Sequence, residues 1–227
     1  MVVIPAYQAA RTLPSVLAGL ARAAPASHVL VVDDGSSDGT GRVAADRGAQ
    51  VLALAGNAGK GRALAAGVAE ALARGAAAVV TMDADGQHPP ELVPALLAPL
   101  EAGRADVVVG ARRRDDGTMP WPRQVTNWLS SALVSRALGT AVPDSQCGFR
   151  AFTRGVAEAI RPAGARYEYE TEFLLMAGAA GFRIASVTVP TVYAGSRSHF
   201  RHATDTLRLA RVFIRHWRPI LLGPAGS

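Results

Sequence analysis

The sequence predicts an α/β fold in which helices cover both faces of a mostly parallel central sheet. Over the first 110 residues, short apolar runs typical of buried strands alternate with amphipathic stretches of helical period. Polar residues follow several of the expected strands, at Tyr7, Asp33–Asp34, Asp83–Asp85 and Arg112. Because ligands of open α/β sheets bind beside the carboxyl ends of the strands, these clusters indicate one ligand-binding edge.

The expected strands are apolar runs that end at turn-forming or acidic residues. Val2–Ile4 ends at Pro5, and the run over 28–32 ends at Asp33. Pro190 interrupts the last run, because proline lacks the N–H that a sheet requires. Strands are predicted over residues 2–4, 28–32, 51–54, 77–82, 106–110, 149–152 and 184–192.

The expected helices are stretches whose apolar residues recur every three or four positions. Leu13, Leu17 and Leu20 follow this spacing, and Pro90 stands where a first helical turn tolerates proline. Helices are predicted over residues 13–20, 40–47, 62–74, 90–102, 121–138, 170–180 and 204–217, with a charged loop over 112–117. No repeat or long linker divides the chain, so we expect one domain over 1–200 and a dependent helical tail over 201–227.

The positive charge of the chain is concentrated at its C-terminal end. The 227 residues carry a net charge of +6, but residues 197–227 hold six arginines against one aspartate, a net +5. The nearly neutral body argues against a nucleic-acid-binding protein. Arg208, Arg211, Arg215 and Arg218 form one stripe of an amphipathic helix. Such a stripe is typical of a membrane surface, and equally of a docked helix with a solvated face.

Composition excludes several other classes of protein. Hydrophobic residues make up 49% and charged residues 19% of the chain, which excludes intrinsic disorder. The single cysteine, Cys147, excludes an internal disulfide framework and a cysteine metal cluster. The sequence has no apolar run of about 20 residues and no secretion signal, so the expected location is cytoplasmic.

The segment Asp83-Ala84-Asp85-Gly86-Gln87 predicts a site for a divalent cation. Two carboxylates two residues apart, just past a strand, can approach one Mg²⁺ or Mn²⁺, and Gln87 adds an amide oxygen. By spacing alone, a polar loop with capping aspartates is an equally good interpretation. Its place at a strand end, beside the other polar clusters, favours a ligand site.

Two further segments bear on nucleotide binding. Asp33 could accept hydrogen bonds from a ribose or a base, while Asp38 or Thr40 caps the following helix. Asn57–Gly61 is rich in glycine but lacks the spacing of a phosphate-binding P-loop. A P-loop nucleoside triphosphatase is therefore rejected, and the segment is interpreted as a glycine-rich turn before a helix.

In their order along the chain, these motifs resemble those of glycosyltransferase family 2, inverting enzymes with the Rossmann-like GT-A fold. The matching segments are 3–7, 31–40, 57–61, 83–91, 109–112, 146–150 and 167–172. The last three make the chain similar to polyprenyl-phosphate (dolichyl-phosphate-type) mannosyl- and glucosyltransferases. The resemblance covers about residues 2–200 and implies a GT-A domain, followed by the amphipathic C-terminal helix.

The resemblance implies roles for individual residues. Asp85 and Arg112 would be catalytic, and Asp85 and Gln87 would hold Mg²⁺ or Mn²⁺ on the diphosphate. The residues expected to bind the nucleotide sugar are Pro5, Tyr7, Val31, Asp33, Asp83 and Ala84. Those expected to meet the acceptor phosphate are Arg112, Arg123 and Arg197. Relatives often have Asn-Glu where this chain has Gln8 and Ala9, so the choice of base (GDP or UDP) stays open.

The implied activity is transfer of mannose or glucose from GDP-mannose or UDP-glucose to a polyprenyl phosphate. The protein would lie peripherally at the inner face of the membrane, and a membrane-anchoring partner subunit is compatible with the sequence. Hydroxyl-directed relatives carry Glu-Asp where this chain has Glu170-Thr171, which favours a phosphate acceptor that needs no general base. Glu170 or Glu172 could still serve as that base, or could pair with arginines and cap a helix.

Two alternatives stay open for the function. The same fold could transfer sugar to a hydroxyl group of a soluble molecule or glycan. A non-catalytic protein that binds a nucleotide sugar or a nucleic acid is a weaker hypothesis, because the charge of the body is nearly balanced.

Overall fold

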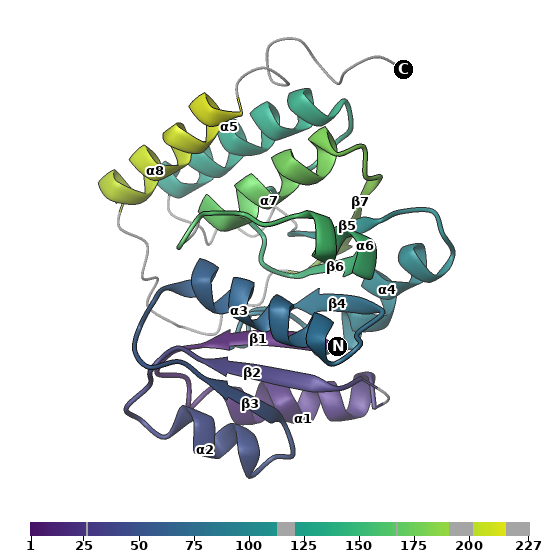
Figure 1. Ribbon diagram of the computed structural model, residues 1–227. Coiled ribbons are helices and arrows are strands. Elements are labelled where there is room, and N and C mark those ends of the chain that lie inside the picture. The colour runs from purple at the N-terminus through teal and green to yellow at the C-terminus, as the bar shows by residue number, and fades with distance from the viewer. Residues whose placement is uncertain (26, 113–120, 167, 191–201, 217–227) are drawn as a thin grey trace.

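The computed structural model describes residues 1–25, 27–112, 121–166, 168–190 and 202–216, with the side chains of 121–124 and 202–208 outside the description. Within these ranges, seven strands form one sheet in the order β3-β2-β1-β4-β6-β5-β7 (Figure 1). β6 is antiparallel to its neighbours β4 and β5, and the other pairs are parallel. The mostly parallel α/β fold predicted from the sequence is confirmed.

Each strand overlaps the one predicted for it. The strands are β1 (Val2–Ala6), β2 (Val29–Asp33), β3 (Gln50–Ala53), β4 (Ala78–Thr81), β5 (Val107–Arg112), β6 (Arg150–Thr153) and β7 (Ile184–Val189). β1 continues through Pro5, where a strand end was expected, and β7 stops before Pro190. The antiparallel β6 begins opposite the end of β4, where Thr81 pairs with Arg150, and runs back across the sheet.

The helices are α1 (Leu13–Ala23), α2 (Thr40–Ala45), α3 (Lys60–Ala73), the 3₁₀ turn η1 (Pro90–Leu92), α4 (Val93–Glu101), α5 (Trp121–Leu138), α6 (Arg154–Ala159), α7 (Glu168–Ala179) and α8 (His202–Arg215). The helix expected over 90–102 is thus divided into η1 and α4. The short helix α6 was not predicted, because six residues carry too little periodic pattern. The Thr153 hydroxyl caps it by accepting the Val156 N–H.

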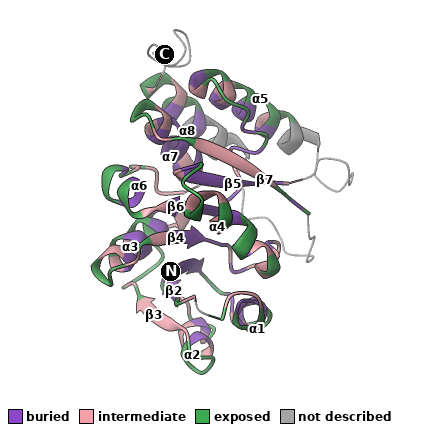
Figure 2. Cartoon of the chain, turned by 90° about the vertical axis from the view of Figure 1, so that its right-hand side faces the viewer, coloured by how far each residue is buried: buried purple, intermediate pink, exposed green. Residues whose placement is uncertain are grey.

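The inner strands of the sheet are buried, the edge strands β3 and β7 are partly exposed, and the helices expose their outer sides (Figure 2). α3 packs on β1 and β2, and Gly67 permits this close approach. A Cβ atom at Gly67 would lie 2.4 Å from Cγ1 of Val3 and 2.8 Å from Cγ2 of Val32. The core therefore fixes α3, and with it the turn that precedes Lys60, against the central strands.

A second group of helices lies at the other end of the molecule from α1 and α2 (Figure 1). α5 packs against α7, and α7 packs against α8. Within the described part of the chain, none of the helices combines the length and the apolar character of a membrane-spanning segment. The division into a domain over 1–200 and a dependent tail over 201–227 stays a prediction.

Candidate functional site

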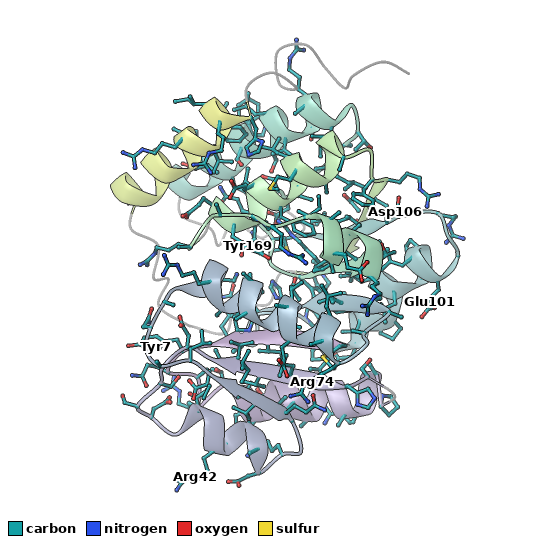
Figure 3. All side chains as sticks on the ribbon, viewed as in Figure 1. Tyr7, Arg42, Arg74, Glu101, Asp106 and Tyr169 are labelled. Carbon is teal, nitrogen blue, oxygen red and sulfur yellow. The ribbon has the colours of Figure 1, made fainter. Side chains whose placement is uncertain are left out.

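The polar residues expected at strand ends do meet at one edge of the sheet. β1 pairs in parallel with β2 and β4, so Tyr7, Asp33 and Asp83 follow neighbouring strand ends. Arg112 ends β5, which runs in the same direction because β6 is antiparallel to both β4 and β5. Tyr7 is 45% exposed beyond the end of β1, at the outer side of this edge in Figure 3. The predicted placement at a common strand edge is confirmed.

Hydrogen bonds tie the chain after β1 to the chain after β2. The Gln8 N–H donates to the Ser36 hydroxyl at 3.0 Å, and the Gln8 side-chain amide donates to the Ser37 hydroxyl at 2.9 Å. The Ala10 N–H donates to Asp38 at 3.0 Å. Gln8 adopts a left-handed backbone (φ 53°), which is uncommon without glycine. Gln8 thus serves to join these two loops in the structure.

The two aspartates that follow β2 have different surroundings. Asp33 is nearly buried and accepts the Ser36 N–H at 2.9 Å. Asp34 is buried and accepts two N–H groups of the glycine-rich turn, from Ala58 at 2.7 Å and from Gly59 at 2.9 Å. Asp34 therefore anchors the Asn57–Gly61 turn, a role that sequence analysis missed because no spacing rule links the two segments.

Lys60 joins this turn to Asp83 and to α7. Its Nζ lies 2.7 Å from Oδ1 of Asp83 and 2.8 Å from Oε1 of the buried Glu170. Burial alone would raise the pKa of Asp83, but the charge of Lys60, its hydrogen bond and the other basic groups nearby together outweigh burial and lower that pKa to about 2. A Cβ atom at Gly148 would lie 2.9 Å from both Asp83 Oδ1 and Lys60 Nζ. Asp83 is therefore a fixed, ionised group beside a position that only glycine fits.

Asp85, unlike Asp83, has no cationic partner in the part of the chain that the structure describes. No ion pair joins it to a lysine or an arginine among the residues that the structure describes. Burial, and next the negative charge of Asp83, raise the pKa of Asp85. The Gln87 N–H donates to its Oδ1 at 2.9 Å, and the Thr12 hydroxyl holds the Ala84 carbonyl at 2.7 Å. The loop thus holds one uncompensated carboxylate in a fixed place.

This carboxylate fits a divalent cation, because such a cation would supply the missing positive charge. The described residues hold no group of three or more His, Cys, Asp or Glu side chains that could bind a metal by themselves. A cation at Asp85 would therefore take most of its ligands from a bound diphosphate, from water and from amide oxygens such as that of Gln87. Mg²⁺ and Mn²⁺ both accept such oxygen ligands.

His88 and Cys147 are parts of the core under this loop. His88 is buried, its Nδ1 accepts the Asp83 N–H at 3.1 Å, and its ring stacks on Phe149 at 5.2 Å. Burial lowers the pKa of His88, so the imidazole is neutral near pH 7. Burial also raises the pKa of the Cys147 thiol to about 12, which makes it a poor nucleophile. His88 thus supports the Asp83 backbone, and Sγ of Cys147 lies 3.9 Å from Nε2 of His88.

Arg112 is held by a residue that sequence analysis did not single out. Its Nε lies 2.5 Å and its Nη2 3.1 Å from the two carboxylate oxygens of Asp144, which also accepts the Asn127 amide at 3.3 Å. Burial alone would lower the pKa of Arg112, but Asp144 outweighs burial and raises it. A two-point contact of this kind orients the guanidinium plane. Arg112 is therefore a permanently charged and rigidly placed group.

Other predicted site residues are placed less directly. Pro5 and Val31 are buried within β1 and β2. The side chain of Arg123 lies outside the described residues, and so does Arg197. Glu170 pairs with Lys60 instead of with an arginine, whereas Glu172 pairs with Arg215 and accepts two backbone N–H groups, as one of the alternatives expected.

Together, the fold and the strand-end groups define an α/β protein whose carboxylates and arginine gather at the edge where open α/β sheets bind ligands. The chain belongs to glycosyltransferase family 2, because the model of glycosyl transferase family 2 matches residues 1–161. This finding confirms the resemblance drawn from the strand-end motifs. The family membership also accounts for the position of the aspartate loop at the strand edge.

Two characterised relatives are similar in sequence. The polyprenol monophosphomannose synthase of Mycolicibacterium smegmatis is 39% identical over 170 residues, which cover 70% of this chain and 63% of the relative. The undecaprenyl-phosphate mannosyltransferase of Micrococcus luteus is 36% identical over 205 residues, which cover 85% of this chain and 83% of the relative. The match thus spans somewhat less than two thirds of the first relative and most of the second.

Solved structures confirm the fold. Glucosyl-3-phosphoglycerate synthase of Mycobacterium tuberculosis with phosphoglyceric acid matches with a TM-score of 0.78 and 24% identity, over 95% of this chain and 78% of that one. The same enzyme with Mn²⁺, UDP-glucose and phosphoglyceric acid matches with a TM-score of 0.73 and 26% identity, over 99% and 80%. The cation and the nucleotide sugar are thus ligands of that neighbour.

Proposed function

We propose that this protein transfers a hexose from a nucleoside diphosphate sugar to a polyprenyl phosphate, with inversion at the anomeric carbon. The observation that carries the proposal is the 36% identity to an undecaprenyl-phosphate mannosyltransferase over 85% of the chain. The geometry of the strand edge supports it. Asp85, which has no cationic partner among the described residues, could bind a cation on the donor diphosphate, and Arg112, held by Asp144, could bind the acceptor phosphate. Mannose, carried by GDP, is the first sugar to test, because both relatives are named for it.

The donor would bind at the edge formed by the ends of β1, β2 and β4. Tyr7 and Asp33 would hold the nucleoside, with Pro5 and Val31 forming the strands beneath it. Asp83 and Ala84 would contact the nucleotide sugar, supported by Lys60 and by the Thr12 hydroxyl. Asp85 and Gln87 would hold Mg²⁺ or Mn²⁺ against the diphosphate. When bound, the cation offsets the negative charge that develops on the leaving diphosphate.

The transfer breaks the bond between the anomeric carbon and the diphosphate oxygen and forms a bond from that carbon to an acceptor oxygen. A phosphate monoester is already anionic near pH 7, since its second pKa is about 6, and it needs no general base. This suits the surroundings of Glu170, which is buried and paired with Lys60, and of Thr171, which cannot accept a proton. Arg112, held by Asp144, would meet the acceptor phosphate, with Arg123 and Arg197 as further candidates.

A lipid acceptor requires a surface that meets the membrane, and two helices offer one. α5 exposes Val125, Trp128 and Leu129 at 43%, 58% and 51%, spaced so that they share one side of the helix. On α8, Ile214 is 70% exposed, and Arg211 and Arg215 are exposed as well. Exposed apolar and cationic side chains favour the surface of an anionic bilayer, so we propose a peripheral membrane location.

A second candidate is transfer to a hydroxyl group of a small phosphorylated molecule. The likeness to glucosyl-3-phosphoglycerate synthase in complex with UDP-glucose and phosphoglyceric acid, at 26% identity over 99% of this chain, favours it. That acceptor would need a general base, and Glu170 is the buried carboxylate available. It would first have to be released from Lys60.

A donor screen separates the two candidates. Radiolabelled GDP-mannose and UDP-glucose would be incubated with the protein, Mn²⁺ and vesicles with or without undecaprenyl phosphate, and in parallel with phosphoglyceric acid. The proposal predicts label in the organic phase only when polyprenyl phosphate and cation are both present. Label confined to a water-soluble product would support the second candidate, and no transfer from any common donor would contradict both.

A further inference from the structure

The C-terminal helix ends on a buried carboxylate of α7. α8 packs on α7, and its Leu209 and Val212 are buried. At its end, Nη1 of Arg215 lies 3.1 Å and Nε2 of His216 lies 3.7 Å from Oε1 of Glu172. Glu172 is buried, so Arg215 supplies the charge that compensates a carboxylate held away from water.

The second oxygen of Glu172 holds a loop. Oε2 accepts the N–H groups of Ala163 and Gly164, both at 2.8 Å. One turn earlier on α7, Glu168 accepts the Ala165 N–H at 3.2 Å. The three consecutive N–H groups of the loop 163–165 are therefore fixed by two glutamates of α7. Glu172 also pairs with α8 through Arg215.

This loop in turn presses on the glycine-rich turn before α3. The Gly61 N–H donates to the Ala165 carbonyl at 2.9 Å. A Cβ atom at Gly59 would lie 2.6 Å from the Ala165 oxygen, and one at Gly61 would lie 2.3 Å from the Gly164 oxygen. Backbone packs on backbone with no room for a side chain. Any shift of the loop must therefore shift the turn.

The turn carries Lys60, whose ammonium lies on Asp83 and Glu170. Asp34 holds the same turn from the opposite side through Ala58 and Gly59. The path from α8 to Asp83 thus begins with the ion pair of Arg215 and Glu172 and continues through the two backbone N–H groups that donate to Glu172. It then crosses the backbone contact between the loop 163–165 and the glycine-rich turn, and ends at the ion pair of Lys60 and Asp83. Each step is a contact between groups that are fixed in place.

We infer that Glu172 is a positioning residue that couples the C-terminal helix to the donor site. The inference rests on the proposed function only in taking Asp83 and Lys60 as parts of that site. When α8 is packed on α7, Arg215 compensates the charge of Glu172, and Glu172 holds the loop 163–165. That loop in turn holds the turn that places Lys60 beside Asp83. A ligand or a surface that draws Arg215 away would loosen the donor site from a distance.

Amide hydrogen exchange of the full chain tests this coupling without any substrate. Arg215→Gln and Glu172→Gln should speed exchange by about tenfold or more in peptides that contain Gly61, Ala163 and Gly164. The reason is that the acceptors of these N–H groups, Glu172 and the Ala165 carbonyl, are no longer held in place. Arg211→Gln is the matched control, since it removes the same charge from an exposed position of α8, whereas Arg215 is the residue that pairs with Glu172. Arg215→Lys should restore slow exchange.

The outcomes separate the coupling from a general loss of stability. Unchanged exchange at Gly61 in Arg215→Gln would overturn the inference, even if exchange at Ala163 and Gly164 rises. If Glu172→Gln unfolds, the exposed Arg215 variants decide the matter. Titration with GDP and UDP in the presence of Mn²⁺ should show several-fold weaker binding by Arg215→Gln than by Arg211→Gln. Altered exchange in a protein that shows no sugar transfer would leave the coupling intact and overturn the proposed function instead.

Discussion

The strand-end loops and the helices α5 and α8 differ in how firmly the structure holds their side chains. In the loops after β1, β2 and β4, polar side chains are tied to backbone groups of neighbouring loops, as Asp34 is to Ala58 and Gly59. On α5 and α8, apolar and cationic side chains such as Trp128 and Arg211 are exposed. The first region fits a charged, water-soluble donor that must be held in one orientation. The second fits a surface that is itself apolar and anionic.

The two regions also treat charge differently. At the strand edge, Lys60 and Arg112 each have carboxylate partners, so both side chains keep their positive charge although they are largely buried. Asp85 is the exception, because none of the ion pairs among the described residues includes it, and this favours a cation at Asp85. On α8, in contrast, most of the Arg215 side chain stays exposed while it pairs with Glu172. Charged side chains at the strand edge are thus held by buried partners, whereas those on α8 stay largely exposed to solvent.

The largest expected effect is on Asp85. Asp85→Asn should lower the rate of transfer by about 100-fold or more, because it removes the carboxylate proposed to hold the cation. Initial rates over a range of Mn²⁺ concentrations measure this. Glu101→Gln, an exposed acid on α4, is the control and should behave as the wild type. Full metal-dependent activity in Asp85→Asn would remove the cation from this site.

The next effect concerns the anchored guanidinium. Arg112→Lys should lower kcat/KM for polyprenyl phosphate by about tenfold to 100-fold, because lysine cannot form the two-point contact with Asp144. Asp144→Asn should have a similar effect, since it frees the guanidinium to rotate. Steady-state kinetics with varied acceptor would detect the change. If Arg112→Lys instead weakened only the binding of the donor, by a similar factor, Arg112 would belong to the donor site and not to the acceptor site.

A smaller effect tests how tightly the donor region is packed. Gly148→Ala should destabilise the fold by about 1–3 kcal/mol, because its Cβ would displace Asp83 from Lys60. The Thr81 hydroxyl, which donates to the Gly148 carbonyl at 2.7 Å, prevents the backbone from moving aside. Gly155→Ala in α6 has open space and should be neutral or stabilise by up to about 1 kcal/mol. Urea unfolding measures both, and equal stabilities would contradict the account.

The smallest effect concerns the exposed apolar side of α5. Trp128→Ser should weaken binding to vesicles that contain anionic lipid by about tenfold, since the indole would no longer bury apolar area in the bilayer. Nucleotide binding in the absence of vesicles should not change, because Trp128 lies outside the strand edge. Vesicle co-sedimentation measures the first and calorimetry the second. Unchanged vesicle binding would show that α5 does not meet the membrane.

The sequence predicted the parts of this fold that depend on local pattern. The strands were found because buried runs such as Val107–Val109 are continuous, and the binding edge because Asp33 and Asp83 follow such runs. The motifs also led to the correct family. The short helix α6 escaped notice because it spans less than two turns.

Contacts between distant segments could not be predicted in this way. Asp34 and the Asn57–Gly61 turn, Arg112 and Asp144, and Lys60 and Glu170 are each joined only by the folded sheet. No periodicity or motif records such a pair in a single sequence. The glycine-rich turn was correctly interpreted as a turn before a helix. That this turn positions Lys60 beside Asp83 is visible only in the three-dimensional structure.

The most direct test of the central claim is the chemical nature of the product. Labelled product would be extracted with organic solvent after incubation of donor, Mn²⁺, undecaprenyl phosphate vesicles and protein. One part would be examined directly by ¹H and ³¹P NMR, and a second part would be treated with mild acid and tested for released sugar. The account predicts a lipid phosphodiester in which the sugar has the inverted anomeric configuration and is released by mild acid. An acid-stable glycoside, with the acceptor phosphate still a monoester, would contradict it.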